Sequence, residues 1–336
     1  MKKIIGTLLF AALLTVSCEQ QEAQLAPQKK AISFTTESVG TKTTYSGEVQ
    51  GGKEVIKWQT GDIFSVWCDQ AVVGDGSQKK ANYKVTASSQ GVATAVTPQS
   101  ADAEMAWGEG LHHFFAAYPS GNLVGNKFNA NIPATQQVRE SSTNVFSPLL
   151  YQYGYMVAAT DATQDEGAVL LRFRPIFTTL EFTVSPGPDT DVTVSDFRLE
   201  GAEGTTLAGQ FQASLSASAD PEIAVSLASS AIQLSFDSGG SVTVGKNQTL
   251  TFSVIALPVS LSNLTAVFTV NNQEISLPLN DKSGSPITFA AGKKSRIRAL
   301  GILAPQTEPE PEDTPTDIDV DIDDQDIDDY DLSAGD

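Results

Sequence analysis

The feature that most constrains the fold of this chain is an alternation of apolar and polar residues with period two, running from about residue 31 to residue 303. Segments such as VTVSDFRLE (192–200) and LTAVFTV (264–270) combine this alternation with β-branched and aromatic side chains, which are enriched in strands. Clusters of Gly, Asn, Asp and Ser separate the segments at intervals of about ten residues, a spacing typical of β-sandwiches. Helical periodicity is nearly absent, so the sequence predicts an all-β fold of antiparallel sandwiches.

Composition predicts how the chain is divided. The polar stretch TDATQDEG (160–167) precedes a strongly apolar segment, and it predicts a boundary between two tandem sandwich domains of ordinary size. The predicted order is a signal peptide ending at a lipidated cysteine (1–18), a linker (19–30), an N-terminal β-sandwich domain (31–165), a C-terminal β-sandwich domain (166–303) and a Pro/Asp-rich acidic tail (304–336).

The first residues have the pattern of an export signal. Two lysines precede an apolar run from Ile4 to Val16, which is too short to span a bilayer comfortably. The run ends in LTVSC, which resembles the lipobox of bacterial lipoproteins, so we expect Cys18 to be acylated and to anchor the chain in the outer membrane at the cell surface. Only Cys68 then remains, so the mature chain forms no internal disulfide, and we interpret Cys68 as a core residue.

The charge of the chain is concentrated at its end. The formal net charge is −19, and residues 304–336 contain 14 acidic residues and no Lys or Arg, which leaves −5 for the preceding 303 residues. Phosphates would be repelled by a chain of this charge, which argues against a nucleic-acid partner.

Motifs for catalysis or cofactor binding fail on inspection. His112 and His113 are neighbours on a predicted strand, so they face opposite sides and are poorly placed to share a metal. The stretch GGSVTVGKN (239–247) has the glycine and lysine spacing of a phosphate loop, but Asn247 replaces the required hydroxyl residue and SVTV has the pattern of a strand. We therefore predict a protein that is not an enzyme and has no cofactor.

Three stretches suggest a family. TKTTYSGEVQGGKEVIKWQTGDIFSVW (41–67), FFAAYPSG (114–121) and LLRFRPIFTTLEFTV (170–184) occur here in the order found in Bacteroidetes fimbrillin-like proteins. The chain resembles this family over residues 31 to about 303. The resemblance implies two tandem transthyretin-like sandwiches in a lipoprotein subunit of a fimbria of the type V pilus class, or in a related surface adhesin that binds a host or bacterial surface ligand.

The resemblance also implies a mode of assembly with other fimbrial subunits. In this family a protease is thought to remove an early N-terminal strand, after which the open groove accepts a C-terminal strand of the next subunit by β-augmentation. The cut commonly follows an arginine, but the first arginine here is Arg139, well inside the first predicted domain. Lys30 and Lys42 are the basic residues in the expected region. Without a cut, the subunit would keep its lipid and first strand, as an anchor or accessory subunit does.

The acidic tail permits three interpretations. Its segment DIDVDID (317–323) places Ile318, Val320 and Ile322 on one face of a strand and carboxylates on the other, as a donor strand requires. Asp317, Asp319 and Asp321 have the spacing of calcium ligands, although Ile322 occupies the place of the turn glycine in an EF-hand loop. The high charge density is also typical of a disordered segment.

A binding protein that does not polymerise is the alternative hypothesis. A surface lipoprotein that binds glycans would also consist of paired sandwiches, and it would use exposed aromatic side chains. The candidates for such a platform are Trp67, Trp107 and Tyr153.

Overall fold

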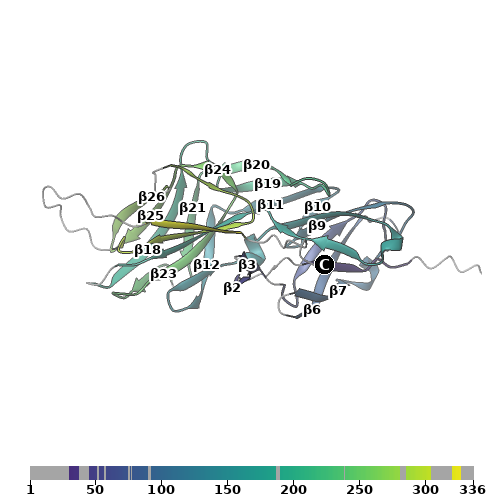
Figure 1. Cartoon of the computed structure of the whole chain (residues 1–336), viewed down its shortest axis with the longest axis horizontal. Coiled ribbons are helices and arrows are strands. Elements are labelled where there is room, and N and C mark those ends of the chain that lie inside the picture. The colour runs from purple at the N-terminus through teal and green to yellow at the C-terminus, as the bar shows by residue number, and fades with distance from the viewer. Residues whose placement is uncertain are drawn as a thin grey trace, which may run out of the picture.

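The structure is a computed structural model of the whole chain (Figure 1). It describes residues 30–37, 45–50, 53–56, 58–74, 76, 78–89, 92–186, 190–237, 239–280, 285–303 and 320–326. Almost every regular element in the described part is a β-strand, which confirms the predicted all-β fold. The helical elements there are the short α1 (Leu150–Tyr153) and the 3₁₀ turns η1 (Ala101–Ala103) and η2 (Gln164–Glu166). No helix in the described part has the length and apolar character needed to cross a bilayer.

One end of the elongated molecule is built around a six-stranded sheet (Figure 1). Its order is β16 (Arg174–Pro175), β14 (Met156–Ala162), β9 (His112–Tyr118), β4 (Ile63–Trp67), β6 (Lys80–Ser89) and β7 (Val92–Pro98). Two two-stranded sheets accompany it: β1 (Phe34–Glu37) with β15 (Val169–Arg172), and β5 (Val72–Val73) with β8 (Met105–Ala106). A third, β2 (Tyr45–Gln50) with β3 (Lys53–Ile56), lies in the middle of the molecule (Figure 1).

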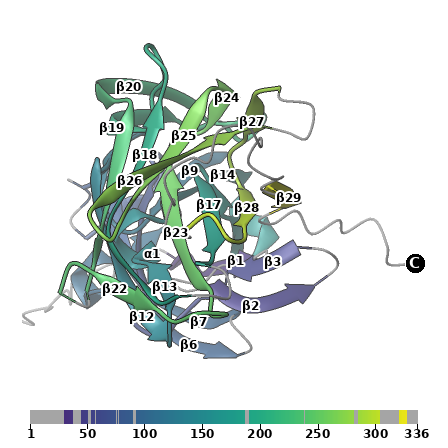
Figure 2. The same cartoon turned by 90° about the vertical axis from the view of Figure 1, so that its left-hand side faces the viewer.

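The other end contains a large curled sheet of eleven strands (Figure 2). Its order is β26 (Gln273–Leu279), β25 (Leu264–Val270), β18 (Val192–Gly201), β21 (Ala231–Phe236), β12 (Thr135–Ser142), β13 (Val145–Pro148), β23 (Leu250–Ala256), β17 (Thr178–Val184), β28 (Lys293–Ala299) and β29 (Val320–Asp326), with β22 (Val242–Val244) beside β18. A small sheet of β24 (Val259–Ser262) and β27 (Ile287–Phe289) lies nearby.

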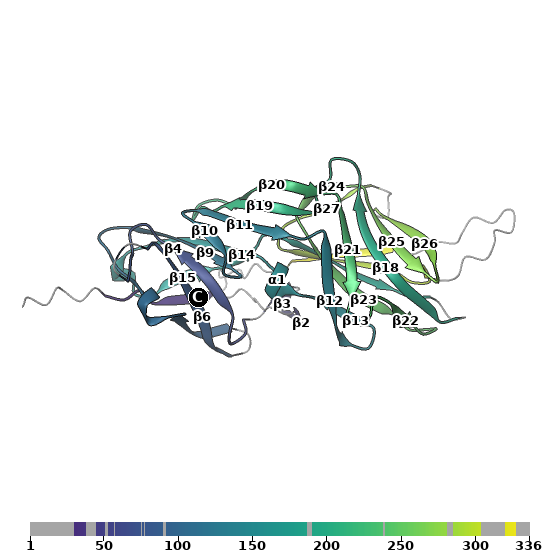
Figure 3. The same ribbon diagram turned by 180° about the vertical axis from the view of Figure 1, so that it is seen from behind.

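A four-stranded sheet runs along the molecule between the two ends (Figure 3). Its order is β10 (Asn122–Val124), β11 (Lys127–Ile132), β19 (Ala208–Ser214) and β20 (Glu222–Ser229). All three of its pairings are antiparallel.

Strand pairing crosses the predicted boundary at residue 165. β11 pairs with β19, β12 pairs with β21, and β13 pairs with β23, so strands from the first half complete sheets of the second half. In the opposite direction, β15 follows residue 165 and pairs with β1. The polar stretch that predicted the boundary forms the 3₁₀ turn η2 between β14 and β15. Division into units 31–165 and 166–303 stays a prediction, and these pairings mean that such units would share strands.

The cores are rich in aromatic rings that meet mainly edge to face. At the six-stranded end, the buried rings belong to Phe34, Trp58, Phe64, Tyr83, Trp107, Phe114 and Phe173. In the eleven-stranded sheet, they belong to Phe146, Phe182, Phe197, Phe236, Phe252 and Phe268. Aromatic pairs of this geometry add about 0.5–1.5 kcal/mol beyond the burial of their area. Packing of this kind explains how the chain is stabilised with Cys68 as the one free cysteine in the described part.

Candidate functional site

The first described strand is seated deeply in the core at the six-stranded end. Within Ala31–Glu37, the side chains of Ile32, Phe34 and Thr36 are 3%, 6% and 4% exposed, whereas Ser33 and Thr35 face outward and are exposed. The sequence AISFTTE produces this pattern directly because successive side chains of a strand point to opposite faces. Segment 31–37 therefore fills three alternate positions of an otherwise continuous core.

Phe34 makes the most extensive of these contacts. Its ring centroid lies 4.7 Å from that of Tyr83 and 5.6 Å from that of Phe114, both in edge-to-face geometry. Burial raises the pKa of the Tyr83 hydroxyl to about 12, which marks the surroundings of Phe34 as strongly desolvated. Removing β1 would therefore open an aromatic pocket to water.

Thr36 is less well accommodated than its two neighbours. Its hydroxyl oxygen is buried, and no described residue forms a hydrogen bond with it. A buried hydroxyl without a partner costs about 1–3 kcal/mol. An aliphatic side chain at this position would avoid that cost.

Backbone hydrogen bonds connect this segment to short segments elsewhere in the chain. β1 pairs in parallel with β15, with Phe34 opposite Val169, and the Val169 N–H donates to the Ser33 carbonyl at 2.8 Å. Upstream, the Ile32 N–H donates to the Met105 carbonyl at 2.8 Å, and the Trp107 N–H donates to the Lys30 carbonyl at 2.9 Å. The segment is thus an inserted strand with backbone neighbours from two distant parts of the chain, residues 105–107 and β15.

The two lysines predicted as cleavage sites occupy different positions relative to β1. Lys30 precedes β1, so a cut after it would leave Phe34 in place. The Nζ of Lys30 donates a hydrogen bond to the Gln164 carbonyl at 3.2 Å, and the Lys30 carbonyl accepts one from the Trp107 N–H. Lys42 follows β1 and lies outside the described residues; a cut after it would place all of β1 in the released fragment. Arg139 belongs to β12, inside the large sheet.

Part of the acidic tail forms a strand. β29 pairs antiparallel with β28, with Val320 opposite Ala299 and Ile322 opposite Ile297, and it forms the end of the eleven-stranded sheet (Figure 2). Ile318 lies outside the described residues. A tail strand is therefore present, and in this structure its partner is a strand of the same chain.

The register of β29 matches acidic residues with basic ones. Asp321, Asp323 and Asp326 are opposite Arg298, Arg296 and Lys293, respectively. Cross-strand pairs of opposite charge contribute about 0.2–1 kcal/mol each. Asp321 thus occupies a strand beside an arginine rather than the turn that an EF-hand loop requires, while Asp317 and Asp319 lie outside the described residues. Within the described part, no three His, Cys, Asp or Glu residues are grouped for a metal ion.

Glu181 holds β28 in place beneath β29. It lies on the adjacent strand β17, where one carboxylate oxygen is 2.5 Å from the Nζ of Lys294 and the other is 3.2 Å from the Nε of Arg296. Lys294 is almost fully buried, so its charge needs this carboxylate. The ion pairs explain how a strand with the sequence KKSRIRA can lie inside a sheet.

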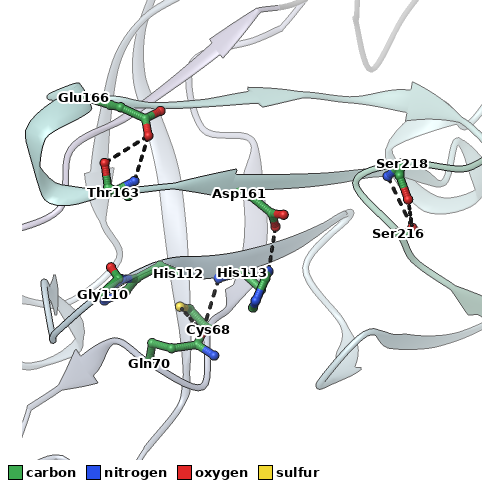
Figure 4. A network of polar contacts seen from close by, with 10 residues as sticks. All are labelled: Cys68, Gln70, Gly110, His112, His113, Asp161, Thr163, Glu166, Ser216 and Ser218. Atoms are coloured by element: carbon green, nitrogen blue, oxygen red, sulfur yellow. Dashed lines mark hydrogen bonds and ion pairs between the residues drawn. The ribbon is translucent and has the colours of Figure 1, made fainter.

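The neighbouring histidines are directed to different surroundings, as predicted for a strand (Figure 4). His112 is buried; its Nε2 accepts from the Gly108 N–H at 3.0 Å and its Nδ1 lies 3.0 Å from the Gly110 carbonyl. The exposed His113 is 2.7 Å from Asp161 through Nδ1. These contacts assign structural roles to both side chains.

Cys68 lies close to the histidine pair but is a core residue. Its side chain is fully buried, its sulfur is 3.4 Å from the Gln70 Oε1, and burial raises the pKa of its thiol (Figure 4). A raised pKa disfavours the reactive thiolate.

The predicted aromatic platform does not form from the three named residues. Trp107 is 4% exposed and packs against His112 and Phe114, so it is a core residue. Trp67 and Tyr153 are half-buried and pack against the hydrophobic core, and the Nε1 of Trp67 donates to Asp69. Trp107, a candidate residue of the alternative glycan-binding hypothesis, is therefore inaccessible to a ligand in this structure, because the β8–β9 segment directs its ring into the core.

Sequence reasoning did not single out Phe34 or Thr36. The signal that could have found them is the alternation in AISFTTE, three residues before the TKTTY motif. Taken together, the described geometry offers two terminal strands, one inserted in the core and one at a sheet edge, and no catalytic constellation within the described residues.

Comparison with known proteins identifies the family to which this chain belongs. The sequence model of the fimbrillin-like family matches residues 41–324, which is most of the chain. The chain belongs to the fimbrillin-like family. The family is one of structural rather than enzymatic proteins, in agreement with the prediction that the chain is not an enzyme. No curated protein sequence matches the chain.

Solved structures share the fold of this fimbrillin-like chain. A candidate cell adhesion protein from Bacteroides ovatus superposes with a TM-score of 0.53 at 12% identity, covering 90% of this chain and 100% of that one. One from Bacteroides uniformis gives a TM-score of 0.53 at 14% identity and covers 88% of this chain and 99% of its own. At these identities the similarity is one of fold.

Proposed function

We propose that the chain is a structural subunit of a surface fimbria that assembles by β-strand exchange and contributes to adhesion. The observation that carries this proposal is the inserted strand β1, whose Ile32, Phe34 and Thr36 fill alternate core positions. Family membership supports a place at the cell surface among other fimbrial subunits, and the described solved relatives are candidate cell adhesion proteins. Acylation of Cys18 would attach the subunit to the outer membrane.

In the proposed exchange, a protease cuts after Lys42 and β1 leaves with the released fragment. The empty site then exposes the aromatic pocket of Phe34 and the unpaired backbone of β15, both of which are unfavourable in water. Lys42 is preferred over Lys30 because only the later cut separates β1 from the rest of the chain.

The tail of the next subunit has the pattern that this site requires. Ile318, Val320 and Ile322 alternate with Asp, as Ile32, Phe34 and Thr36 alternate with outward-facing residues. Burying an Ile or Val side chain contributes about 1.5–3 kcal/mol. An aliphatic residue in the place of Thr36 would also replace a buried hydroxyl that has no partner among the described residues.

The same geometry accounts for an anchor or accessory role. A subunit in which Lys42 is not cut keeps β1, and therefore cannot accept a donor strand in that site. Its own tail could still leave β28 and enter the open site of another subunit. Proteolysis thus distinguishes a subunit that extends the fimbria from one that ends it.

The test uses residues 19–336, which lack Cys18 and therefore its lipid, after limited digestion with a lysine-specific protease. We expect SDS-resistant ladders from the unaltered chain and from Lys30→Gln, and none from Lys42→Gln or from Ile322→Asp. Lys30→Gln is the matched control, because it removes a nearby lysine without protecting β1. A folded, verifiably cut chain that stays monomeric, or a ladder unaffected by both Lys42→Gln and Ile322→Asp, would refute the proposal.

A further inference from the structure

The sheet edges of the described part are protected in different ways, with one exception. Edge strands expose unpaired N–H and C=O groups, and proteins limit this with short strands, charges, prolines and bulges. Two edge strands, β10 and β16, are short. β26 contains Glu274 and Pro278, and β29 is acidic. β7 ends in Pro98, and its pairing with β6 is interrupted by bulges. The exception is β20, the outer strand of the four-stranded sheet, whose bulge lies near its end and leaves the five residues from Glu222 to Ser226 flat (Figure 3).

β20 is long and uncharged along its middle. Its eight residues, EIAVSLAS, contain one charge, Glu222 at the start, and no proline. All but Ile223 and Ser229 are exposed, and among the described strands only β19 pairs with it. Ile223 and Val225 lie opposite Ala213 and Phe211, two buried residues of β19, so apolar side chains of this edge border the core.

A bulge near the end of β20 presents a leucine to solvent. Leu227 has φ +49°, a left-handed conformation that is unusual for a bulky residue, and its side chain is 77% exposed. Gly209 on β19 permits the bulge, because a Cβ there would lie 2.9 Å from the Leu227 carbonyl oxygen. The pairing from Glu222 to Ser226 is regular, so five residues of the edge remain flat. Because Leu227 is exposed in a strained backbone conformation, we look for a functional role for its side chain.

We infer that β20 is a self-association surface on which the β20 strand of a second copy pairs antiparallel about a two-fold axis near Val225. In that register Val225 faces its symmetry mate and Ala224 of each copy faces Ser226 of the other, all within the regular stretch, while the exposed Leu227 lies beside the contact on the bulge. The two Glu222 residues lie on opposite sides of the axis, so no like charges meet. An isologous contact of this kind closes after two subunits. It would join subunits side by side, and it does not depend on strand exchange.

Charge argues for a second β20 rather than an acidic tail as the occupant. β28, which carries the tail strand in this structure, contributes Lys293, Arg296 and Arg298 opposite aspartates. β20 contains no Lys or Arg to match the same aspartates, and its single charge is also acidic. Backbone pairing would therefore favour a strand with few charges, and β20 itself fits that description.

Cysteine cross-linking of residues 19–336, which lack Cys18, tests the register. Val225→Cys should form an intermolecular disulfide under mild oxidation, because the two residues face each other across the axis. Val124→Cys is the matched control: Val124 is 55% exposed at the opposite edge of the same sheet and should remain uncross-linked. Cys68 is buried in both variants. Equal cross-linking of the two variants, or none at Val225→Cys while the chain sediments as a monomer at about 100 μM, would overturn the inference.

Two further variants separate the interface from folding and from the tail. Leu227→Asn should weaken self-association about tenfold, while the free energy of unfolding stays equal or rises, because Asn tolerates positive φ better than Leu. Ile322→Asp in the tail should leave Val225→Cys cross-linking unchanged. Loss of the cross-link with Ile322→Asp would instead identify the tail as the occupant and refute a β20 pair.

Discussion

β1 and β29 are both terminal strands, and they are held in opposite ways. β1 inserts three alternate side chains into an aromatic core, whereas β29 lies at a sheet edge with aspartates in register with Lys and Arg. Apolar burial is strong and insensitive to salt, but exposed charge pairs are weak and screened. The difference implies that removing β1 from its site would cost far more free energy than separating β29 from the sheet edge.

The largest effect is expected when the anchor of β1 is removed. Phe34→Ala should lower the free energy of unfolding by about 3–5 kcal/mol, because it leaves a cavity beside Tyr83 and Phe114. Thr35→Ala, on the exposed face of the same strand, should change it by less than about 0.5 kcal/mol. Urea denaturation measures both. Equal effects of the two substitutions would show that β1 is not held by apolar burial.

Alkaline pH should loosen β1 through Tyr83. Burial raises the pKa of Tyr83 to about 12, against about 10 for an unfolded tyrosine, so the folded state favours the protonated form. The associated stability is fully present below pH 10 and is lost as the pH rises toward 12, by about 2–3 kcal/mol. Tyr83→Phe should remove this part of the slope in unfolding curves, whereas exposed Tyr151→Phe should not. Identical slopes for all three proteins would contradict the assignment.

The stability of β28, the strand with which β29 pairs, should depend on Glu181. Glu181→Gln leaves the buried Lys294 without its carboxylate and should cost about 2 kcal/mol of stability. Exchange of the β28 amides with deuterium should accelerate with it. Glu274→Gln, on an exposed carboxylate that pairs with Arg198, is the control and should have little effect. If the β28 amides of Glu181→Gln were as protected from exchange as those of the unaltered chain, Glu181 would not be what stabilises this sheet edge.

The smallest effects are expected at β29 itself. Arg298→Glu should weaken docking of the tail by about 0.2–1 kcal/mol, and adding Asp321→Arg should restore it, since the two residues are opposite each other. Salt should reduce the difference between the variants. Deuterium exchange of the Ile297 and Arg298 amides reports the docking. A double variant no better than the single one would show that the register is not set by charge.

The sequence predicted the fold class because period-two alternation and turn residues are local signals. The alternation in DIDVDID allowed a donor strand as one of three interpretations, and in the structure part of this segment lies in β29, paired within the same chain. The sequence alone could not provide the partner of that strand, because pairing with β28 joins residues separated by a proline-rich segment. Only the register reveals that Arg296 and Arg298 face aspartates.

Long-range pairing accounts for features that local sequence patterns do not contain. TDATQDEG has the composition of a linker, and in the structure it includes a turn between strands whose partners lie on both sides of residue 165. The packing of Trp107 against Phe114 is likewise a tertiary contact. The importance of β1 was hidden because a four-residue strand is a weak local signal, although its burial is nearly complete.

The most direct test of strand exchange is displacement of β1 by a tail peptide. The chain cut after Lys42 would be mixed with a peptide of residues 316–332, and the mass of the complex would be measured by native mass spectrometry. The uncut chain is the control. We predict that the cut chain loses the fragment that contains Phe34 and gains one peptide, and that the uncut chain gains none in that site. A cut chain that keeps its fragment at saturating peptide, or one that accepts equally a peptide with Asp at 318, 320 and 322, would contradict the account.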